Sequence, residues 1–331
     1  MKKGIIAFSI IMSVSSIPVL KGQADDEFKP GGKIFGLLFT DFHTSFSGGH
    51  NTSAFEVRRS YLGFDYSFSQ EFSSRILYDG MTETINGKMI YTGYLRNAYI
   101  QYDNGKVTIK GGLIGAEHIT ITEKLWNYRY ITKSFIDYTG MIFPADLGLM
   151  AKARAGEKIT LDLSVTNGRG FRDIAPDGTY RLSTGATVVP CKNVMIRGYY
   201  DIMGPSGRMQ RTASIIGAWS GPVFSAGAEY LRQENNKMIS GNNYSGFSIF
   251  TTLKLSEKVA LFARYDDIGS VTPEGADEAW NIGRDGSNFF VGFDVSPVGN
   301  VRFSPNFAGF ISDDVDATFT GTIGLNVEAR F

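Results

Sequence analysis

The chain has 331 residues, with 33 Lys plus Arg balanced by 33 Asp plus Glu, 43% hydrophobic residues, 13% aromatic residues and one cysteine. The aromatic content and balanced charge exclude a disordered chain, because disorder goes with few aromatic residues and high net charge. Beyond the first twenty-odd residues no apolar run reaches the roughly 20 residues of a membrane-spanning helix, which excludes a helical membrane protein. The lone Cys191 excludes an intramolecular disulfide and a cysteine-type zinc site.

The N-terminus has the pattern of a secretory signal peptide. Two lysines follow the initiating Met, an apolar stretch covers 5–14, and the small residues Gly22 and Ala24 precede an acidic pair. A membrane anchor is the alternative, but the apolar stretch is closer to about 10 residues than to the roughly 20 that an anchor needs. We therefore expect a signal peptide over 1–24 and a single mature domain over 25–331.

Short segments in which apolar and polar residues alternate fill the rest of the chain. The clearest is the last, in which apolar residues from Ile323 to Phe331 alternate strictly with Thr, Gly, Asn, Glu and Arg, as in a strand with one apolar face. The alternation predicts about sixteen strands, an even number as in bacterial outer-membrane barrels. We place them at 33–43, 55–68, 71–81, 94–103, 106–114, 146–155, 158–167, 180–190, 193–202, 210–219, 222–232, 244–255, 258–266, 287–296, 300–311 and 320–331.

The connections between these strands also follow a pattern. Short turns alternate with longer, polar, Gly-rich loops, which is typical of a transmembrane barrel. A soluble sandwich or propeller is the alternative, but its core would have to bury the second strand faces. Those faces are rich in charged residues, and burial costs several kcal/mol for each unpaired group. Aromatic residues such as Tyr66, Phe68 and Phe72 crowd strand ends and suit the membrane interfaces. The sequence therefore predicts an all-β, antiparallel transmembrane barrel of about 16 strands in a bacterial outer membrane.

The polar strand faces would line the interior of such a barrel. About sixteen strands leave room for an aqueous channel, although the charges could instead pair and plug the lumen. Arg96 conflicts with the pattern because it falls on an apolar face, so we expect a bulge there or a side chain that reaches the interface. Our candidate pore-lining residues are Arg59, Asp65, Arg75, Asp79, Lys110, Lys152, Arg154, Arg197, Arg264 and Arg302.

The segment 115–145 is much longer than the other loops and has a helical pattern of its own. Thr120 and Glu123 fit a capping box, and apolar residues recur at helical spacing from Leu125 to Phe135. A long loop with apolar contacts is typically packed, so we expect this third loop to fold into the barrel and narrow it. An extracellular lid or a contact within a trimer is the alternative. The residues expected to face solutes are Glu123, Lys124, Arg129 and Lys133.

Two stretches resemble a known family. EVRRSYLGFDYSF at 56–68 and LRNAYIQYDNGKVTIKGGLIG at 95–115 look like the early strands of the phosphate-selective porin O and P family, a Bacteroidota-type porin. The resemblance covers the first third of the chain in motif and the whole chain in strand count and loop order. It implies a homotrimeric barrel that passes small hydrophilic solutes. Phosphate selectivity is not carried over, because inward Arg and Lys are interspersed with Asp and Glu. Only three residues align with basic pore positions: Arg58, Arg59 and Arg75.

Catalysis and cofactor binding have no support in the sequence. The three histidines, His43, His50 and His118, each lie near a predicted strand end or in a loop, where a lone histidine is usually solvated. None of them lies in a G-x-S-x-G serine motif, and no two His or Cys stand at metal-ligand spacing. No Gly-rich loop follows a strand and opens a helix as a phosphate-binding loop does. We expect no enzymatic activity, no cofactor, no metal and no nucleic-acid partner.

The sequence thus predicts an outer-membrane porin for passive diffusion of small polar solutes or inorganic ions. Charge selectivity should be weak, because pores select ions through rings of charged side chains and the charges here are mixed. The alternative is a sealed outer-membrane surface protein or receptor that binds a partner through its polar loops. Those loops lie at 45–53, 168–178, 233–243 and 269–285.

Overall fold

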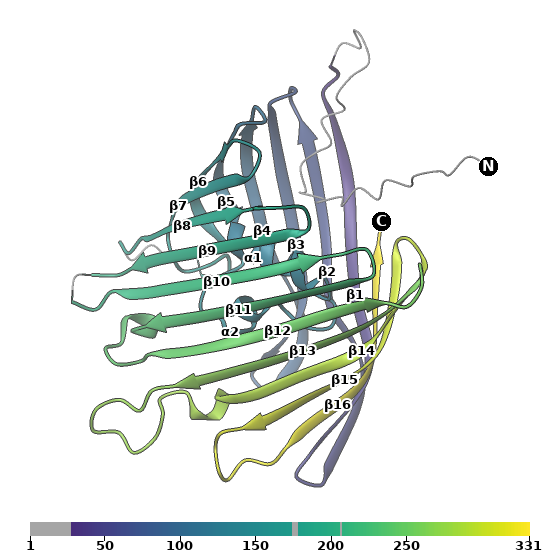
Figure 1. The fold of residues 1–331 in the computed structure, drawn as a ribbon, viewed down its shortest axis with the longest axis vertical. Coiled ribbons are helices and arrows are strands. Elements are labelled where there is room, and N and C mark those ends of the chain that lie inside the picture. The colour runs from purple at the N-terminus through teal and green to yellow at the C-terminus, as the bar shows by residue number, and fades with distance from the viewer. Residues whose placement is uncertain (1–27, 174–177, 206) are drawn as a thin grey trace.

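The computed structural model describes residues 28–173, 178–205 and 207–331, and the segment expected to be a signal peptide lies outside them. Sixteen antiparallel strands in the described residues form one closed barrel, in which each strand pairs with its neighbours in the chain and β1 pairs with β16 (Figure 1). The predicted fold class is confirmed. The strands are β1 (Gly31–Ser47), β2 (His50–Ser67), β3 (Phe72–Ile85), β4 (Lys88–Asp103), β5 (Val107–Gly115), β6 (Ala145–Ala155), β7 (Ile159–Thr166), β8 (Arg181–Val188), β9 (Val194–Met203), β10 (Gln210–Ser220), β11 (Phe224–Glu234), β12 (Tyr244–Lys254), β13 (Val259–Ser270), β14 (Gly286–Val298), β15 (Val301–Ser312) and β16 (Thr320–Arg330).

The four longest strands, β1 to β4, extend beyond the predicted boundaries at one end of the barrel. β1 and β2 remain paired up to Ser47 and His50, so that only Gly48 and Gly49 form the connection. Both glycines have positive φ angles, a conformation that glycine adopts without a steric penalty. The prediction of a polar loop at 45–53 is therefore wrong. Most of these residues belong to the two strands, which a tight hairpin turn connects.

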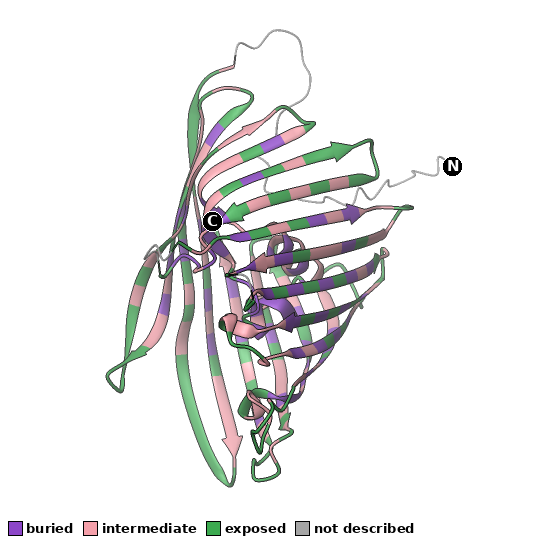
Figure 2. Cartoon of the chain, turned by 90° about the vertical axis from the view of Figure 1, so that its left-hand side faces the viewer, coloured by how far each residue is buried: buried purple, intermediate pink, exposed green. Residues whose placement is uncertain are grey.

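The outer surface of the barrel is apolar. Large hydrophobic side chains such as Leu62, Ile76, Leu161 and Ile215 are exposed, and burial alternates along the strands (Figure 2). A closed sheet leaves no unpaired strand edge, so every backbone group of the wall can be satisfied in lipid. The surface therefore suits a bilayer. Within the part of the chain that the structure describes, no helix is long and apolar enough to cross a membrane.

Aromatic side chains gather where strands meet the turns between them. The rings of Tyr66 and Phe68 lie 4.9 Å apart, and those of Phe72 and Tyr102 lie 5.1 Å apart. At the seam that closes the barrel, the Gly36 and Phe331 backbones exchange hydrogen bonds of 2.8 and 3.1 Å. Because the Phe331 ring covers Gly36, a Cβ at that position would overlap it. The terminal Phe thus completes the sheet.

Arg96 sits at an irregularity in the register between β3 and β4. Leu77 pairs with Asn97 and Tyr78 pairs with Leu95, so Arg96 has no partner residue in the ladder. The extra residue turns the Arg96 side chain inward, where it hydrogen-bonds the Tyr61 hydroxyl. The expected bulge is present, and it removes the conflict between Arg96 and the apolar outer face.

The third loop, residues 116–144, connects β5 to β6 and lies inside the barrel (Figure 1). It contains α1 (Glu117–Trp126) and α2 (Phe135–Thr139); η1 (Asn236–Met238) and η2 (Ile282–Arg284) are single turns in other loops. The prediction of a capping box at Thr120 and Glu123 is wrong. Ala116 is the N-cap of α1, and Thr120 lies within the helix, where its hydroxyl donates to the Ala116 carbonyl. Asn127, in the left-handed conformation, ends α1.

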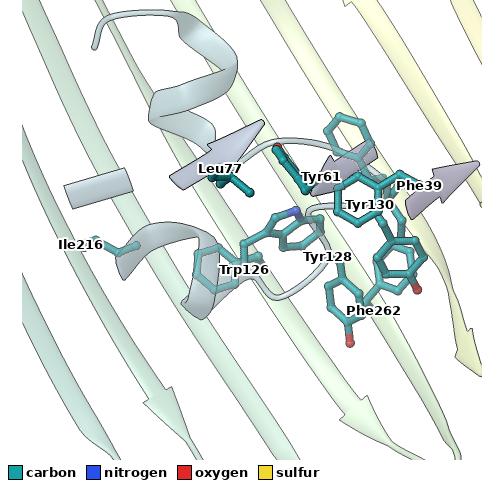
Figure 3. Close-up of a cluster of buried hydrophobic side chains, with 11 residues drawn as sticks. Phe39, Tyr61, Leu77, Trp126, Tyr128, Tyr130, Ile216 and Phe262 are labelled. Carbon is teal, nitrogen blue, oxygen red and sulfur yellow. The ribbon is translucent and has the colours of Figure 1, made fainter. Parts of the chain in front are cut away.

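Aromatic side chains of the third loop form the centre of the main buried cluster (Figure 3). Trp126 is the last residue of α1, Tyr128 and Tyr130 follow it, and all three are at most 2% exposed. Their partners come from β1, β2 and β3 as well as from β10, β12, β13 and β14. The loop therefore packs on a wide arc of the inner wall. These partners are Phe39, Tyr61, Leu77, Ile216, Phe250, Phe262 and Phe290.

Candidate functional site

Three arginines of the barrel wall hold the backbone of the third loop. Arg58 Nη1 donates to the Ile131 carbonyl at 3.1 Å, and Arg264 Nη1 donates to the Lys133 carbonyl at 2.6 Å. Arg302 Nη1 donates to the Asn127 carbonyl at 2.9 Å. Hydrogen bonds from a charged donor are stronger than neutral ones. The loop is therefore tied to the wall at three separate places, on β2, β13 and β15.

Tyrosine hydroxyls of the third loop add contacts to the same wall. Tyr128 donates to Thr252 Oγ1 at 3.1 Å and Tyr130 donates to Asp294 Oδ1 at 2.7 Å. Burial raises the pKa of the Tyr128 phenol to about 12, and burial also raises the pKa of Tyr130. Both hydroxyls therefore stay protonated at neutral pH and act as donors.

Charged groups of both signs meet where the third loop approaches β3 and β4. On the loop, Arg129 lies 2.6 Å from Glu123 and 3.6 Å from Asp137. The Lys133 ammonium lies 3.5 Å from the other oxygen of Asp137. Burial acts to raise the pKa of Asp137, but Arg129 and Lys133 outweigh it, and the pKa falls below its ordinary value. Asp137 is therefore ionised and shared between two cations.

The facing wall repeats this arrangement around a single carboxylate. Arg59 Nε lies 3.4 Å and Arg96 Nη1 lies 3.5 Å from the two oxygens of Asp79. Asp79 is fully buried. We call this group, with the four loop residues Glu123, Arg129, Lys133 and Asp137, the charged contact. It joins acids and bases in nearly equal numbers.

Two lysines of the wall lie near Glu117 in the first turn of α1, and a third lysine lies in the last turn of the helix. Lys152 Nζ lies 3.0 Å from Glu117 Oε1, and Lys110 stands 5.2 Å from the centre of the Tyr99 ring. Lys124 is exposed in the last turn of α1. Burial acts to raise the pKa of Glu117, but Lys152 and Lys110 lower it below its ordinary value. Glu117 is thus a carboxylate that neutralises part of this lysine group.

The remaining predicted pore-lining residues differ in exposure. Arg75 pairs with Asp65 across β2 and β3 at 2.6 Å, and both side chains are about one-fifth exposed. Arg154 is exposed beside a turn, where it donates to the Gly105 carbonyl. Arg197 and Arg264, by contrast, are almost fully buried. Arg197 is 0% exposed and pairs with Asp162, and Arg264 is 1% exposed and pairs with Asp266. Arg302 is 11% exposed and pairs with Asp294.

A buried histidine that the sequence placed in a solvated loop anchors the start of α1. Arg197 Nε donates to His118 Nδ1 at 3.1 Å, and His118 Nε2 lies 3.1 Å from Ser214 Oγ and 3.4 Å from Glu229. The imidazole stacks on the Tyr199 ring at 4.6 Å. Burial lowers the pKa of His118, so the ring is neutral and can accept from Arg197. Sequence spacing gave no signal for this contact, because it joins a loop to three distant strands.

Two further features could hold a bound species. A small cavity of about 40 Å³ lies between the start of α1 and β6 to β9, with Glu117, Asp146 and Arg181 in its lining. Asp41, His43 and Glu56 place their possible ligand atoms within 4.8 Å of one another. Sequence reasoning did not join these three residues, because the register of β1 and β2 brings them together.

Comparison with known proteins identifies the fold. No known protein family and no curated protein matches the chain in sequence. The outer membrane channel DcaP of Acinetobacter baumannii matches with a TM-score of 0.68 at 12% identity, over 91% of this chain and 97% of that one. OmpF of Salmonella typhi matches with a TM-score of 0.67 at 10% identity, over 91% and 97%. An anion-selective porin from Comamonas acidovorans matches with a TM-score of 0.67 at 7% identity, over 92% and 100%.

At these identities the likeness establishes the fold, a sixteen-stranded barrel of the porin type. The chain spans nearly the full length of these structures. The closed sheet, the apolar outer surface and this shared fold place the chain in the bacterial outer membrane.

Proposed function

We propose that the chain is an outer-membrane channel through which small hydrophilic solutes or inorganic ions diffuse passively. The observation that carries the proposal is the charged contact. Its loop residues Glu123, Arg129, Lys133 and Asp137 are paired with one another, and they lie close enough to Arg59, Asp79 and Arg96 of the wall to interact with them electrostatically. A loop held inside a barrel by charged and aromatic contacts narrows the lumen and fixes which side chains face a passing solute. The diffusion step itself needs no chemical reaction.

Mixed charge supports weak ion selectivity. Asp79 stands between two arginines, and Asp137 stands between Arg129 and Lys133. Pores that select ions strongly use rings of one sign, and paired charges cancel much of each other's field. Salt screens the remainder over about 10 Å at 0.1 M.

We also propose that the chain is related to the phosphate-selective porin O and P family and that it forms a homotrimer. The two motifs that carry the resemblance form β2 and the hairpin of β4 and β5. The basic residues that align with the family are engaged with acids, since Arg58 lies 3.0 Å from Asp41 and Arg75 lies 2.6 Å from Asp65. This pairing favours a general porin over a phosphate-selective one.

A sealed surface protein is the second candidate, and two observations favour it. The Arg197 and Arg264 side chains are almost completely buried, and the loop cluster around Trp126 contacts strands on a wide arc of the wall. A filled lumen would leave the extracellular loops as the functional surface.

Single-channel recording of the purified, full-length barrel in a planar bilayer tests the proposal. We expect steady conductance steps and a small reversal potential across a salt gradient. Replacing Arg75 and Lys110 with Ala should shift the reversal potential toward cations, whereas Lys158→Ala, in a turn, should leave it unchanged. An unchanged reversal potential in the double variant would show that these two residues do not face the ion path.

A further inference from the structure

Three side chains with metal-ligand atoms face the interior on neighbouring strands. Asp41 and His43 are two residues apart on β1, so they share a face, and Glu56 on β2 is paired with Asp41 in the ladder. His43 Nδ1 lies 3.3 Å from Asp41 Oδ1, and one ligand atom of each residue lies within 4.8 Å of the other two. None of the three belongs to the charged contact.

We propose that Asp41, His43 and Glu56 form a binding site for a divalent transition-metal ion, with Zn²⁺ as the representative. Zinc binds His nitrogen and carboxylate oxygen at about 2.0–2.2 Å, which sets tetrahedral neighbours about 3.3 Å apart. The separation of His43 and Asp41 already has this value. The imidazole selects against Mg²⁺ and Ca²⁺, which prefer oxygen ligands only.

The surroundings of Asp41 are those of an oriented ligand. Its side chain is 2% exposed, and Asn326 Nδ2 donates to Asp41 Oδ2 at 3.4 Å and to the Tyr130 carbonyl at 3.3 Å. Contacts of this kind fix the orientation of a ligand. The other oxygen, Asp41 Oδ1, is hydrogen-bonded to His43 Nδ1 in the metal-free protein, and a bound ion would take the place of that proton, which moves to Nε2 in the other neutral tautomer of the imidazole. His43 and Glu56 are 20% and 24% exposed, so an ion can reach the site from the interior and keep a water ligand.

Arg58 occupies part of this site in the metal-free protein. Its Nε lies 3.0 Å from Asp41 Oδ2 and 3.8 Å from Glu56 Oε2. Two carboxylates and one guanidinium leave a net negative charge, which favours a divalent cation. The Arg58 side chain is 41% exposed and can turn away. Because Arg58 also donates to the Ile131 carbonyl, an ion that displaces it would loosen one tie of the third loop.

Calorimetric titration of the full-length barrel in detergent with ZnCl₂ tests the site without reference to conductance. We expect one ion per chain, no response to MgCl₂, and roughly tenfold or greater weakening in His43→Ala and in Glu56→Gln. His50→Ala is the matched control, since His50 is an exposed histidine at the start of β2, the strand that carries Glu56. Equal Zn²⁺ affinity in the wild type and in folded His43→Ala would overturn the proposal.

The Arg58→Gln variant is expected to bind Zn²⁺ more tightly than the wild type. Removing the competing guanidinium should tighten Zn²⁺ binding severalfold, which a damaged fold would not produce. Weaker binding in Arg58→Gln would contradict the assignment of Arg58 as the competitor. A barrel that conducts but binds no Zn²⁺ refutes only the metal site, and one that binds Zn²⁺ but stays silent refutes only the channel.

Discussion

Charged side chains inside the barrel are paired with groups of opposite charge. The sequence could predict which of these side chains point inward, but not which residues they pair with. Strand periodicity placed Arg197 on the inner face of its strand, where the structure has it paired with Asp162 at 2.7 Å. The contact from Arg197 to His118 could not be predicted, because it depends on where the third loop lies. For the same reason His118 looked like a solvated loop residue.

His118 gives the structure a dependence on pH. Burial lowers its pKa below 6.5, so the unfolded chain binds a proton more readily than the folded one. The stabilisation is complete above about pH 6.5 and is lost as pH falls through the lowered pKa. The groups facing the ring are Asp162 on β7, Arg197 and Tyr199 on β9, Ser214 on β10 and Glu229 on β11.

We therefore expect the melting temperature of the wild type to fall between pH 7 and pH 5 more steeply than that of His118→Gln. The variant keeps a polar side chain but cannot take up a proton. Circular dichroism of the detergent-solubilised barrel during heating is the measurement. Parallel pH profiles for the two proteins would show that His118 does not titrate in this range.

Among the elements, the third loop is the one whose details the sequence predicted least well. Helical spacing indicated a helix from Leu125 to Phe135. This position is wrong, because α1 ends at Trp126 and residues 127–134 are not helical, so the longer helix of the loop lies earlier in the chain than predicted. The capping box failed because the backbone fixes the start of the helix: the Ala116 amide donates to the Pro144 carbonyl at 3.0 Å and so joins the two ends of the loop. The helix also ends at Trp126, because the residues that follow pack against the wall as separate aromatic anchors.

Trp126 should be essential for holding this loop in place. It packs on Phe250 and Phe262 with ring centres 6.0 Å away in each case, and its indole N–H donates to the Thr132 carbonyl. Trp126→Ala removes a buried ring, which costs about 3–5 kcal/mol. We expect faster amide hydrogen exchange across the third loop in this variant, measured by mass spectrometry.

The matched control is Trp219→Ala, because Trp219 is exposed on the outer face of β10. That variant should leave exchange in the third loop unchanged. If Trp126→Ala exchanged no faster than the control, the polar ties from Arg264 and Arg302 would be sufficient to hold the loop.

At the scale of the whole molecule, the barrel follows directly from the alternation of apolar and polar residues. The predicted strand at 210–219 corresponds to β10 (Gln210–Ser220), and the one at 244–255 corresponds to β12 (Tyr244–Lys254). Period two fixes both the strand and its lipid-facing side, and turn residues fix its ends. How far the interior is filled could not be predicted, since it depends on contacts between residues far apart in the chain.

The uptake of neutral solutes tests the central claim of a diffusion channel most directly. Liposomes that contain the folded barrel should swell rapidly in a neutral pentose, more slowly in a disaccharide and hardly at all in a trisaccharide, because the third loop narrows the lumen. Liposomes without protein supply the baseline. A correctly folded barrel that gives no swelling even with the pentose would contradict the channel and favour the sealed surface protein.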